Sequence, residues 1–186
     1  MDKNKYLQSE IVKCSICGNL PKLKEKSIQI GKTSFIVIGE SPAKDGWIVS
    51  KRAFYNKDNK LQASGRVLEK LLNNIGLSIN DIYFTECCKC IIENRQQLKK
   101  CSKNCLPFLF KQIENLPCRI LVPMGLAPTQ ALLGIKIKRY ADFVGKIFEI
   151  KISNKIYKVL PIYHPSPLNP KGYKNNIPIF DVLKNM

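Results

Sequence analysis

The chain has 186 residues, 45% of them hydrophobic, and carries 31 Lys and Arg residues against 14 Asp and Glu residues, a net charge of +17. This hydrophobic content excludes a generally disordered chain, and no apolar run approaches the roughly 20 residues that a membrane span requires. The positive charge favours a polyanion such as nucleic acid as the partner, but a biased genome that favours Lys, Ile and Asn would produce the same excess.

The N-terminal segment is polar and leads into a pair of cysteines. Residues 1–14, MDKNKYLQSEIVKC, lack the apolar stretch of a secretory signal, so we expect a cytoplasmic protein without disulfide bonds. Cys14 and Cys17 follow in the sequence CSIC. This spacing lets one tight turn present two thiolates to a single metal site, and a second pair of ligands must then come from later in the chain.

Four apolar runs, rich in β-branched and aromatic residues, are spaced along the chain. Their near-continuous hydrophobicity is typical of central strands in a parallel sheet, which are buried on both faces. A further run, IFEIKI at 147–152, predicts an edge strand or a hairpin. The four runs are SFIVIGE at 34–40, IYFTEC at 82–87, RILVPMG at 119–125 and KVLPIYH at 158–164.

Helical patterns fill the intervals between these runs. SGRVLEKLLNNIG at 64–76 predicts an amphipathic helix that is capped by Ser64 and ends at Gly76. The segment 96–116 is mostly helical, with Pro107 breaking or restarting the helix. The length and the alternation of strand and helix predict one α/β domain, with right-handed crossovers covering both faces of a parallel sheet. Ligands of such sheets bind at the carboxyl ends of the strands, here GESPA, TECCKC, PMG and YHPSP.

Six further cysteines are candidates for the second pair of metal ligands. The adjacent pair at the end of the second run has side chains pointing in opposite directions, and the cysteine before the third run has the position of a small buried hydrophobe. Cys90 and Cys105 remain, with Cys101 one helical turn away as a rival to Cys105. Four thiolates could hold zinc or an iron–sulfur cluster, and unrelated buried thiols are the other interpretation. The six candidates are Cys87, Cys88, Cys90, Cys101, Cys105 and Cys118.

The strand-end motifs, taken in order, resemble those of the uracil-DNA glycosylase superfamily, most of all its iron–sulfur branch, family 4. They are GESPA after the first run, then AFYN, KC followed by NR after the second run, PMG after the third and HPSP after the fourth. The resemblance extends from Cys14 to about Asp181. It implies a three-layer α/β/α sandwich around a four-stranded parallel sheet, as a single domain over residues 1–186.

The activity that the resemblance implies is that of a monofunctional DNA glycosylase. Such an enzyme flips uracil or a related deaminated base out of DNA and hydrolyses its N-glycosidic bond, which starts base excision repair. The expected partner is therefore DNA that contains a damaged base, and we expect the protein to act as a monomer, with no membrane association.

The resemblance also selects the metal ligands. The family holds a [4Fe–4S] cluster with an N-terminal CxxC pair and two later cysteines, which correspond here to Cys14, Cys17, Cys90 and Cys105. The last two are separated by fourteen residues, one fewer than is usual in the family. A [4Fe–4S] cluster is thus favoured over zinc, and Cys105 over Cys101.

Loss of the base places negative charge on the pyrimidine and positive charge on the sugar, which calls for a positioned donor and a nearby carboxylate. By resemblance His164, the single histidine of the chain, donates to O2 of the departing base. Glu40 and Asp45 are the catalytic carboxylates, without the attacking water being assigned to either. Phe54 would stack on the flipped base and Ser41 would contact it through its backbone.

The motif after the fourth run supplies the expected contacts with the DNA backbone. In HPSPLNPKGYK, Ser166 would bind a phosphate and Leu168 would fill the space that the flipped base leaves. Lys171 and Lys174 would hold the same strand by their charge.

Glu86 is a departure from the family, whose members usually carry Asn at the end of the second strand to read the base. An ionised carboxylate accepts hydrogen bonds but donates none, so it would repel O4 of uracil and would match an exocyclic amino group. A protonated Glu86, with its pKa raised by burial, would imitate the amide. In the remaining interpretation Glu86 points elsewhere and pairs with Lys89 or Arg95.

Two other function classes remain open at this level. One is a non-catalytic module that holds iron–sulfur or zinc and binds nucleic acid with the same pocket, and the departure at Glu86 keeps this alternative open. The other is a small redox carrier, which would need an exposed cluster with reversible electron transfer.

Overall fold

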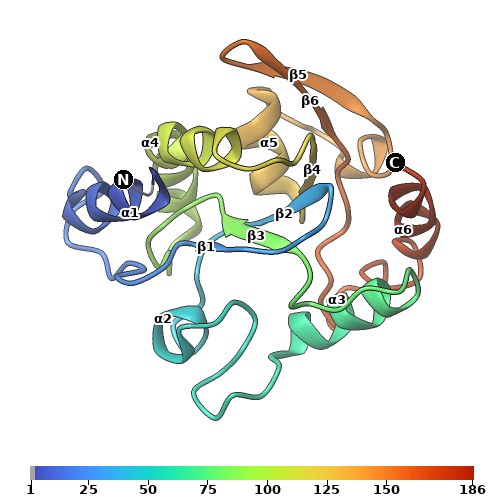
Figure 1. Ribbon diagram of the computed structural model, residues 1–186, viewed down its shortest axis with the longest axis horizontal. Helices are drawn as coiled ribbons and strands as arrows, with labels where there is room; N and C mark the ends of the chain where they lie inside the picture. The colour runs from blue at the N-terminus through green and yellow to red at the C-terminus, as the bar shows by residue number, and fades with distance from the viewer. Residues whose placement is uncertain (1–2) are drawn as a thin grey trace.

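The computed structural model describes residues 3–186, without the side chain of Arg95, and in it a six-stranded sheet is enclosed by helices (Figure 1). The strand order is β1-β3-β2-β4-β6-β5. The strands are β1 (Ile28–Gln29), β2 (Phe35–Gly39), β3 (Tyr83–Glu86), β4 (Ile120–Pro123), β5 (Phe148–Ile152) and β6 (Lys155–Val159).

The sheet is mixed. Neighbouring pairs among β3, β2, β4 and β6 run parallel, while β1 pairs with β3 and β5 pairs with β6 in the antiparallel sense. The α/β class is confirmed, but the sheet is not the expected four-stranded parallel one. The difference lies at the two edges, where the two-residue strand β1 and strand β5, which confirms the edge strand or hairpin predicted at 147–152, lengthen the sheet.

Helices cover both faces of the sheet (Figure 1). α3 and α6 pack on one face, in a hydrophobic cluster with Val37 and Phe84, whereas α4 and α5 pack on the other face, with Ile36 and Tyr83. Within residues 3–186, none of the helices has the length and apolar character needed to cross a membrane. The helices are α1 (Lys3–Lys13), α2 (Trp47–Ser50), α3 (Ala63–Asn73), α4 (Arg95–Glu114), α5 (Leu126–Leu133) and α6 (Ile177–Lys184), with a 3-10 helix at Tyr140–Asp142.

Two sequence predictions about the helices are wrong. α3 has its N-cap at Gln62, so Ser64 lies within the helix and does not cap it. α4 continues without a break through Pro107. The missing N–H of a proline leaves the carbonyl four residues earlier without its helical donor. Here that residue is Lys103, and because both positions are exposed, water can bind the carbonyl instead.

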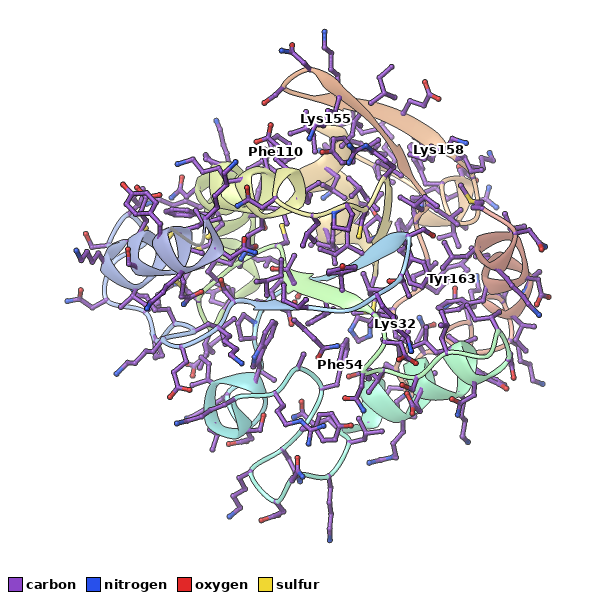
Figure 2. All side chains as sticks on the ribbon, viewed as in Figure 1. Lys32, Phe54, Phe110, Lys155, Lys158 and Tyr163 are labelled. Carbon is purple, nitrogen blue, oxygen red and sulfur yellow. The ribbon has the colours of Figure 1, made fainter. Side chains whose placement is uncertain are left out.

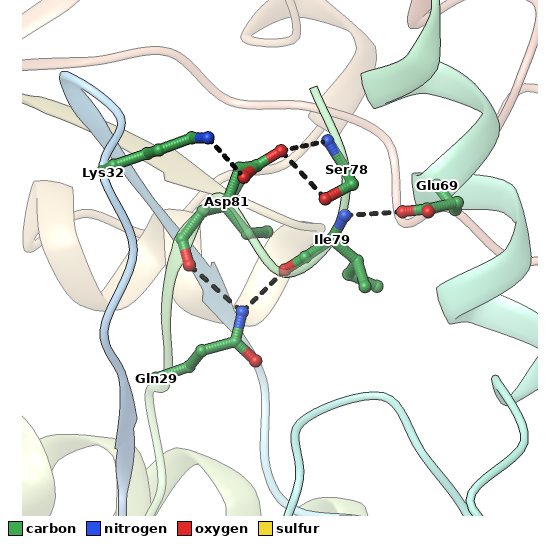
Figure 3. Close-up of polar contacts among 7 residues, drawn as sticks. Gln29, Lys32, Glu69, Ser78, Ile79 and Asp81 are labelled. Carbon is green, nitrogen blue, oxygen red and sulfur yellow. Dashed lines mark hydrogen bonds and ion pairs between the residues drawn. The ribbon is translucent and has the colours of Figure 1, made fainter. Parts of the chain in front are cut away.

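The turn between α3 and β3 is held by a set of polar contacts (Figure 3). Asp81 accepts hydrogen bonds of 2.8 Å from both the backbone N–H and the hydroxyl of Ser78, and pairs with Lys32 Nζ at 3.0 Å. Lys32 and Ser78 lower the pKa of Asp81 to about 2. Glu69 of α3 accepts from the N–H of Ile79 at 2.5 Å. These contacts fix the start of β3, and so the position of the residues at its carboxyl end.

Candidate active site

The carboxyl ends of the parallel strands meet at one edge of the sheet. The backbone N–H of Cys87, after β3, donates to the carbonyl of Gly39 at the end of β2, at 2.8 Å. Beyond β4, the N–H of Gly125 donates to the carbonyl of Ile162 at 2.9 Å. A Cβ atom on Gly125 would lie 3.5 Å from Cβ of His164, so the histidine lies directly beside the end of β4. Segments predicted from separate motifs are therefore brought together.

The loop after β2 carries two of the predicted carboxylates. Glu40 is half-buried, and its carbonyl accepts from the N–H of Cys88 at 2.9 Å, which keeps it next to the end of β3. Ser41 is half-buried beside it, whereas Asp45 is exposed further along the loop. Trp47 packs in the core with its ring centroid 5.5 Å from that of Phe84.

Phe54 lies below β3 in the view of Figure 2 and packs against the sheet. Its ring centroid is 4.3 Å from that of Phe84, and 8% of the residue is exposed. Phe54 therefore packs in the core in this structure, while stacking on a base remains a prediction. Its φ of 69° is in the left-handed region, which non-glycine residues rarely adopt and which is found more often at functional sites.

Gly65 explains how α3 approaches Phe54 so closely. A Cβ atom at Gly65 would lie 2.9 Å from Cβ of Phe54. The sequence signal was present, since a glycine inside an amphipathic helical pattern often marks a close packing contact. We did not use it.

Glu86 ends β3 and faces the same side of the sheet as Phe84, because side chains alternate along a strand. It is 9% exposed, and its Oε2 is buried without a hydrogen-bond partner within the described part of the chain. A Cβ atom on Gly39, its partner in the sheet, would lie 2.1 Å from this oxygen. Burial raises the pKa of Glu86 to about 8; Lys89 opposes this rise and Glu40 adds to it.

Lys89 is buried close to Glu86 but does not bind its Oε2. Its ammonium group donates to Thr85 Oγ1 at 2.8 Å and to the backbone carbonyl of Glu86. The side chain is 2% exposed, and burial lowers its pKa to about 8. Of the two predicted partners of Glu86, Lys89 therefore directs its hydrogen bonds to Thr85 and to the backbone of Glu86, and the side chain of Arg95 lies outside the described part of the chain. The burial of Lys89 was not expected, because lysine side chains are almost always exposed.

His164 begins a compact loop after β6. The side chain is exposed, and its carbonyl accepts from the N–H of Ser166 at 2.8 Å and from Asn169 Nδ2 at 3.1 Å. Ser166 Oγ in turn accepts from the N–H of Leu168 at 3.3 Å. Leu168 is 93% exposed, the highest fraction among the exposed large hydrophobic residues. Lys171 and Lys174, on the same loop, are exposed as well.

Asn176 fixes this loop and was not foreseen from the sequence. Its side chain is fully buried and makes hydrogen bonds with both backbone groups of Tyr163, accepting from the N–H at 3.0 Å and donating to the carbonyl at 2.8 Å. It also donates to the carbonyl of Gly172 at 2.9 Å. The residues flanking His164 are thus tied to the start of α6 by one side chain.

The thiols gather on the other side of β3. Residues 21–23 run alongside residues 89–91, joined by hydrogen bonds from the N–H of Leu23 to the carbonyl of Lys89 at 3.2 Å and from the N–H of Ile91 to the carbonyl of Pro21 at 2.8 Å. This pairing carries the CxxC pair to Cys90. A small hollow, here named the thiol hollow, is lined by Ile11, Cys14, Cys17, Gly18, Lys89, Cys90, Asn104, Cys105 and Phe108.

All four predicted ligands thus line one hollow. Burial raises the pKa of the Cys90 thiol, with Cys17 and Cys14 near enough to add to the rise. Burial also raises the pKa of Cys105 to about 11. Asn104 Nδ2 donates to Cys17 Sγ at 3.3 Å. Nevertheless, over residues 3–186 no three Cys, His, Asp or Glu side chains are grouped closely enough to hold a metal ion.

The other four cysteines do not line the hollow. Cys101 is buried beside Cys17, and burial together with this neighbour raises its pKa to about 12. The adjacent pair after β3 is fully buried, with one thiol in each of two hydrophobic clusters, as the opposite directions of neighbouring side chains predict. The buried position expected of Cys118 is confirmed.

Comparison with known proteins agrees with the family resemblance of the sequence. The chain is similar to the type-4 uracil-DNA glycosylases of Archaeoglobus fulgidus (27% identical over 164 residues, covering 84% of this chain and 78% of the relative) and Saccharolobus solfataricus (27% over 174 residues, 89% and 77%). The type-4 uracil-DNA glycosylase of Pyrobaculum aerophilum is 29% identical over 108 residues, or 56% of this chain and 55% of the relative. The sequence pattern of the Uracil DNA glycosylase superfamily matches residues 25–183, so the chain belongs to this superfamily.

Proposed function

We propose that this protein is a monofunctional DNA glycosylase that removes uracil or a related deaminated base and so starts base excision repair. The observation that carries the proposal is the meeting of Glu40, Glu86 and His164 at one edge of the sheet, with Phe54 packed beside them. The names of the similar proteins support the same reaction.

On the base side of the reaction, the flipped base enters between Phe54 and the ends of the strands. Flipping costs a few kcal/mol of unstacking, which stacking on an aromatic ring, worth about 1–3 kcal/mol, offsets in part. Glu86 contacts the edge of the base, and a backbone amide at Ser41 binds one of its carbonyl groups. His164 donates to O2, where negative charge develops as the bond breaks.

On the sugar side, a carboxylate stabilises the positive charge that develops as the base departs, and water completes the hydrolysis. Glu40 and Asp45 share this role in the proposal. Glu40 has the stronger structural support, because it is half-buried next to the end of β3, whereas Asp45 is exposed. Because water is the nucleophile, the product is an abasic site in an intact strand.

The loop after β6 contacts the DNA backbone. Ser166 and the exposed Lys171 and Lys174 bind phosphates on the damaged strand, and the exposed Leu168 occupies the space that the base vacates. All four residues lie within eleven positions of His164, so the same loop that holds the donor also holds the strand.

Cys14, Cys17, Cys90 and Cys105 would hold a [4Fe–4S] cluster, with zinc as the alternative. The fit is supported by four thiols that line one hollow with a buried lysine, a cationic neighbour suited to an anionic cluster. The cluster would be structural, linking the N-terminal segment to the segment after β3. Protein purified without oxygen should be brown, with broad visible absorption and about four iron atoms per chain. Colourless protein with one zinc per chain would overturn this assignment.

We also propose the domain organisation, the oligomeric state and the location of the protein. Residues 1–186 form one glycosylase domain of which the CxxC segment is part, and the protein acts as a monomer. A cytoplasmic location is supported by eight free cysteines, which suit a reducing compartment.

Incubation with a panel of duplex and single-stranded oligonucleotides tests the function. The substrates carry uracil, hypoxanthine or mismatched thymine, and alkali converts each abasic site into a strand break. Cleavage of the uracil strand is the expected result. Binding to these DNAs with no break in any of them, by protein with its metal intact, would contradict the proposal and favour the non-catalytic nucleic-acid-binding module.

A further inference from the structure

The carboxyl group of Glu86 is buried without full hydrogen bonding. Its Oε2 has no partner among the described residues, and the side chain lies on the face of the sheet where Phe54 and Phe84 pack with ring centroids 4.3 Å apart. A buried polar atom without a partner costs about 1–3 kcal/mol. Such an atom at the ligand-binding edge of an α/β sheet is therefore explained if a ligand supplies the missing bond.

The groups around Glu86 favour its neutral form. Lys89 faces it from the segment after β3, but the ammonium of Lys89 is bound to Thr85 and to the backbone carbonyl of Glu86. Glu40 faces it from the segment after β2 and carries a like charge. The third neighbour is the loop of Phe54, whose aromatic ring cannot stabilise an anion by hydrogen bonds. Burial outweighs Lys89 here, which is why the pKa of Glu86 rises to about 8.

We propose that Glu86 reads the base as a neutral carboxylic acid and that the protein accepts bases that present an N–H donor beside a carbonyl oxygen. This inference rests on the proposed glycosylase function and names its substrate class. Uracil and hypoxanthine both present this edge. The hydroxyl of the acid donates to the carbonyl oxygen of the base, and its carbonyl oxygen accepts from the N–H, so a cyclic pair with two hydrogen bonds forms.

Ionisation of Glu86 removes the donor from this pair. An ionised carboxylate would still accept from the N–H but would repel the carbonyl oxygen of the base. The acid is protonated below its pKa, so base release should be supported below about pH 8 and lost as the pH rises through that value. The rate of base release should therefore fall with rising pH, whereas it would rise with pH if ionised Glu86 recognised an amino group.

Glu86→Gln is the matched variant, because an amide of the same length keeps one donor and one acceptor at every pH. Single-turnover release of uracil and of hypoxanthine is measured from about pH 6.5 to about pH 9.5 for both proteins. Above about pH 8 the wild-type rate constant should fall about tenfold per pH unit, while that of Glu86→Gln should lack this fall. Ionisation of the base itself affects both proteins equally.

Matching pH profiles of the wild type and Glu86→Gln would overturn the inference and leave the glycosylase function standing. Failure of both proteins to release either base at about pH 6.5, while they still bind DNA, would instead contradict the proposed function.

A direct measurement keeps the inference testable if Glu86→Gln folds poorly. The infrared carbonyl band of a protonated carboxyl group should be present in the wild type near neutral pH and disappear by about pH 9.5. In the conservative variant Glu86→Asp, the shorter acid is expected to reach solvent and ionise. This variant should therefore lack the band near neutral pH. A wild-type carboxyl that is already ionised near neutral pH would refute the inference.

Discussion

At the scale of single residues, His164 shows how position decides the role of a side chain. A lone histidine is more often structural than catalytic, yet this one lies exposed beside the end of β4 and begins the loop that carries the proposed DNA contacts. Ser166 and Asn169 donate to its backbone carbonyl and so fix the backbone of the residue. The exposed ring can still reach a substrate.

The change His164→Ala should lower the rate of uracil release by about 10²- to 10³-fold, the usual loss when one donor to a developing negative charge is removed. DNA affinity should stay within a few fold of the wild-type value, because the phosphate contacts remain. Single-turnover kinetics and a binding titration measure the two quantities separately. A parallel loss of binding and release would place His164 in DNA binding rather than in the chemistry.

At the scale of elements, the loop of residues 164–176 behaves as one unit. Asn176 joins both ends of it, through Tyr163 and Gly172, by hydrogen bonds of 2.8 to 3.0 Å. Because the amide is fully buried, no water can replace these bonds without rearrangement of the loop.

Replacing this amide should therefore release the loop. Asn176→Ala is expected to lose about 1–3 kcal/mol of stability for the backbone groups left unpaired, and to weaken DNA binding through the displaced Ser166 and Lys171. Denaturant unfolding and DNA titration measure the two effects. The exposed neighbour supplies the control: Asn175→Ala should change neither quantity, and equal behaviour of the two variants would rule out the anchoring role.

The elements also show what sequence patterns can predict. The central strands were predicted because continuous apolar runs report burial on both faces. The continuity of α4 was missed because it depends on the exposure of Lys103 and Pro107, which is a property of the folded molecule. Likewise α3 begins before Ser64, because the backbone N–H of Gln62 donates to the carbonyl of Phe54 at 2.8 Å, a contact between segments that pattern alone does not report.

At the scale of the whole molecule, the 31 Lys and Arg residues behind the net charge of +17 are distributed along the entire chain. Lys155 begins β6 next to the turn of the β5–β6 hairpin, whereas Tyr163 and the loop that follows lie past the carboxyl end of β6 (Figure 2). Only lysines that contact phosphate contribute to the salt dependence of DNA binding. This dependence therefore separates the lysines that bind DNA from those that only add to the net charge.

Salt titrations of DNA binding make this distinction. The logarithm of the association constant should fall linearly with the logarithm of salt concentration, and Lys171→Ala and Lys174→Ala should each reduce the slope by about 1. Lys155→Ala is the control, because it removes the same charge from the far end of β6 and should leave the slope unchanged. Equal effects of all three changes would mean that net charge alone, rather than the loop, drives binding.

Much of the candidate site could be predicted because its residues lie at strand ends, which meet at one edge in any parallel sheet. That rule brings Glu40, Glu86 and His164 together from sequence alone. It does not supply Asn176 or Lys89, whose roles depend on burial and on partners distant in the chain. The core position of Phe54 likewise depends on its packing against Phe84 and α3, which a rule about strand ends does not report.

The close approach of Glu86 to Gly39 has a consequence for the redesign of the site. A methyl group at position 39 would lie 2.1 Å from Glu86 Oε2 and 3.0 Å from the Phe84 ring, so any side chain there would displace the Glu86 carboxyl group from its present position. The present position of that carboxyl group therefore depends on glycine at 39. Any redesign of base preference at position 86 should accordingly keep this glycine.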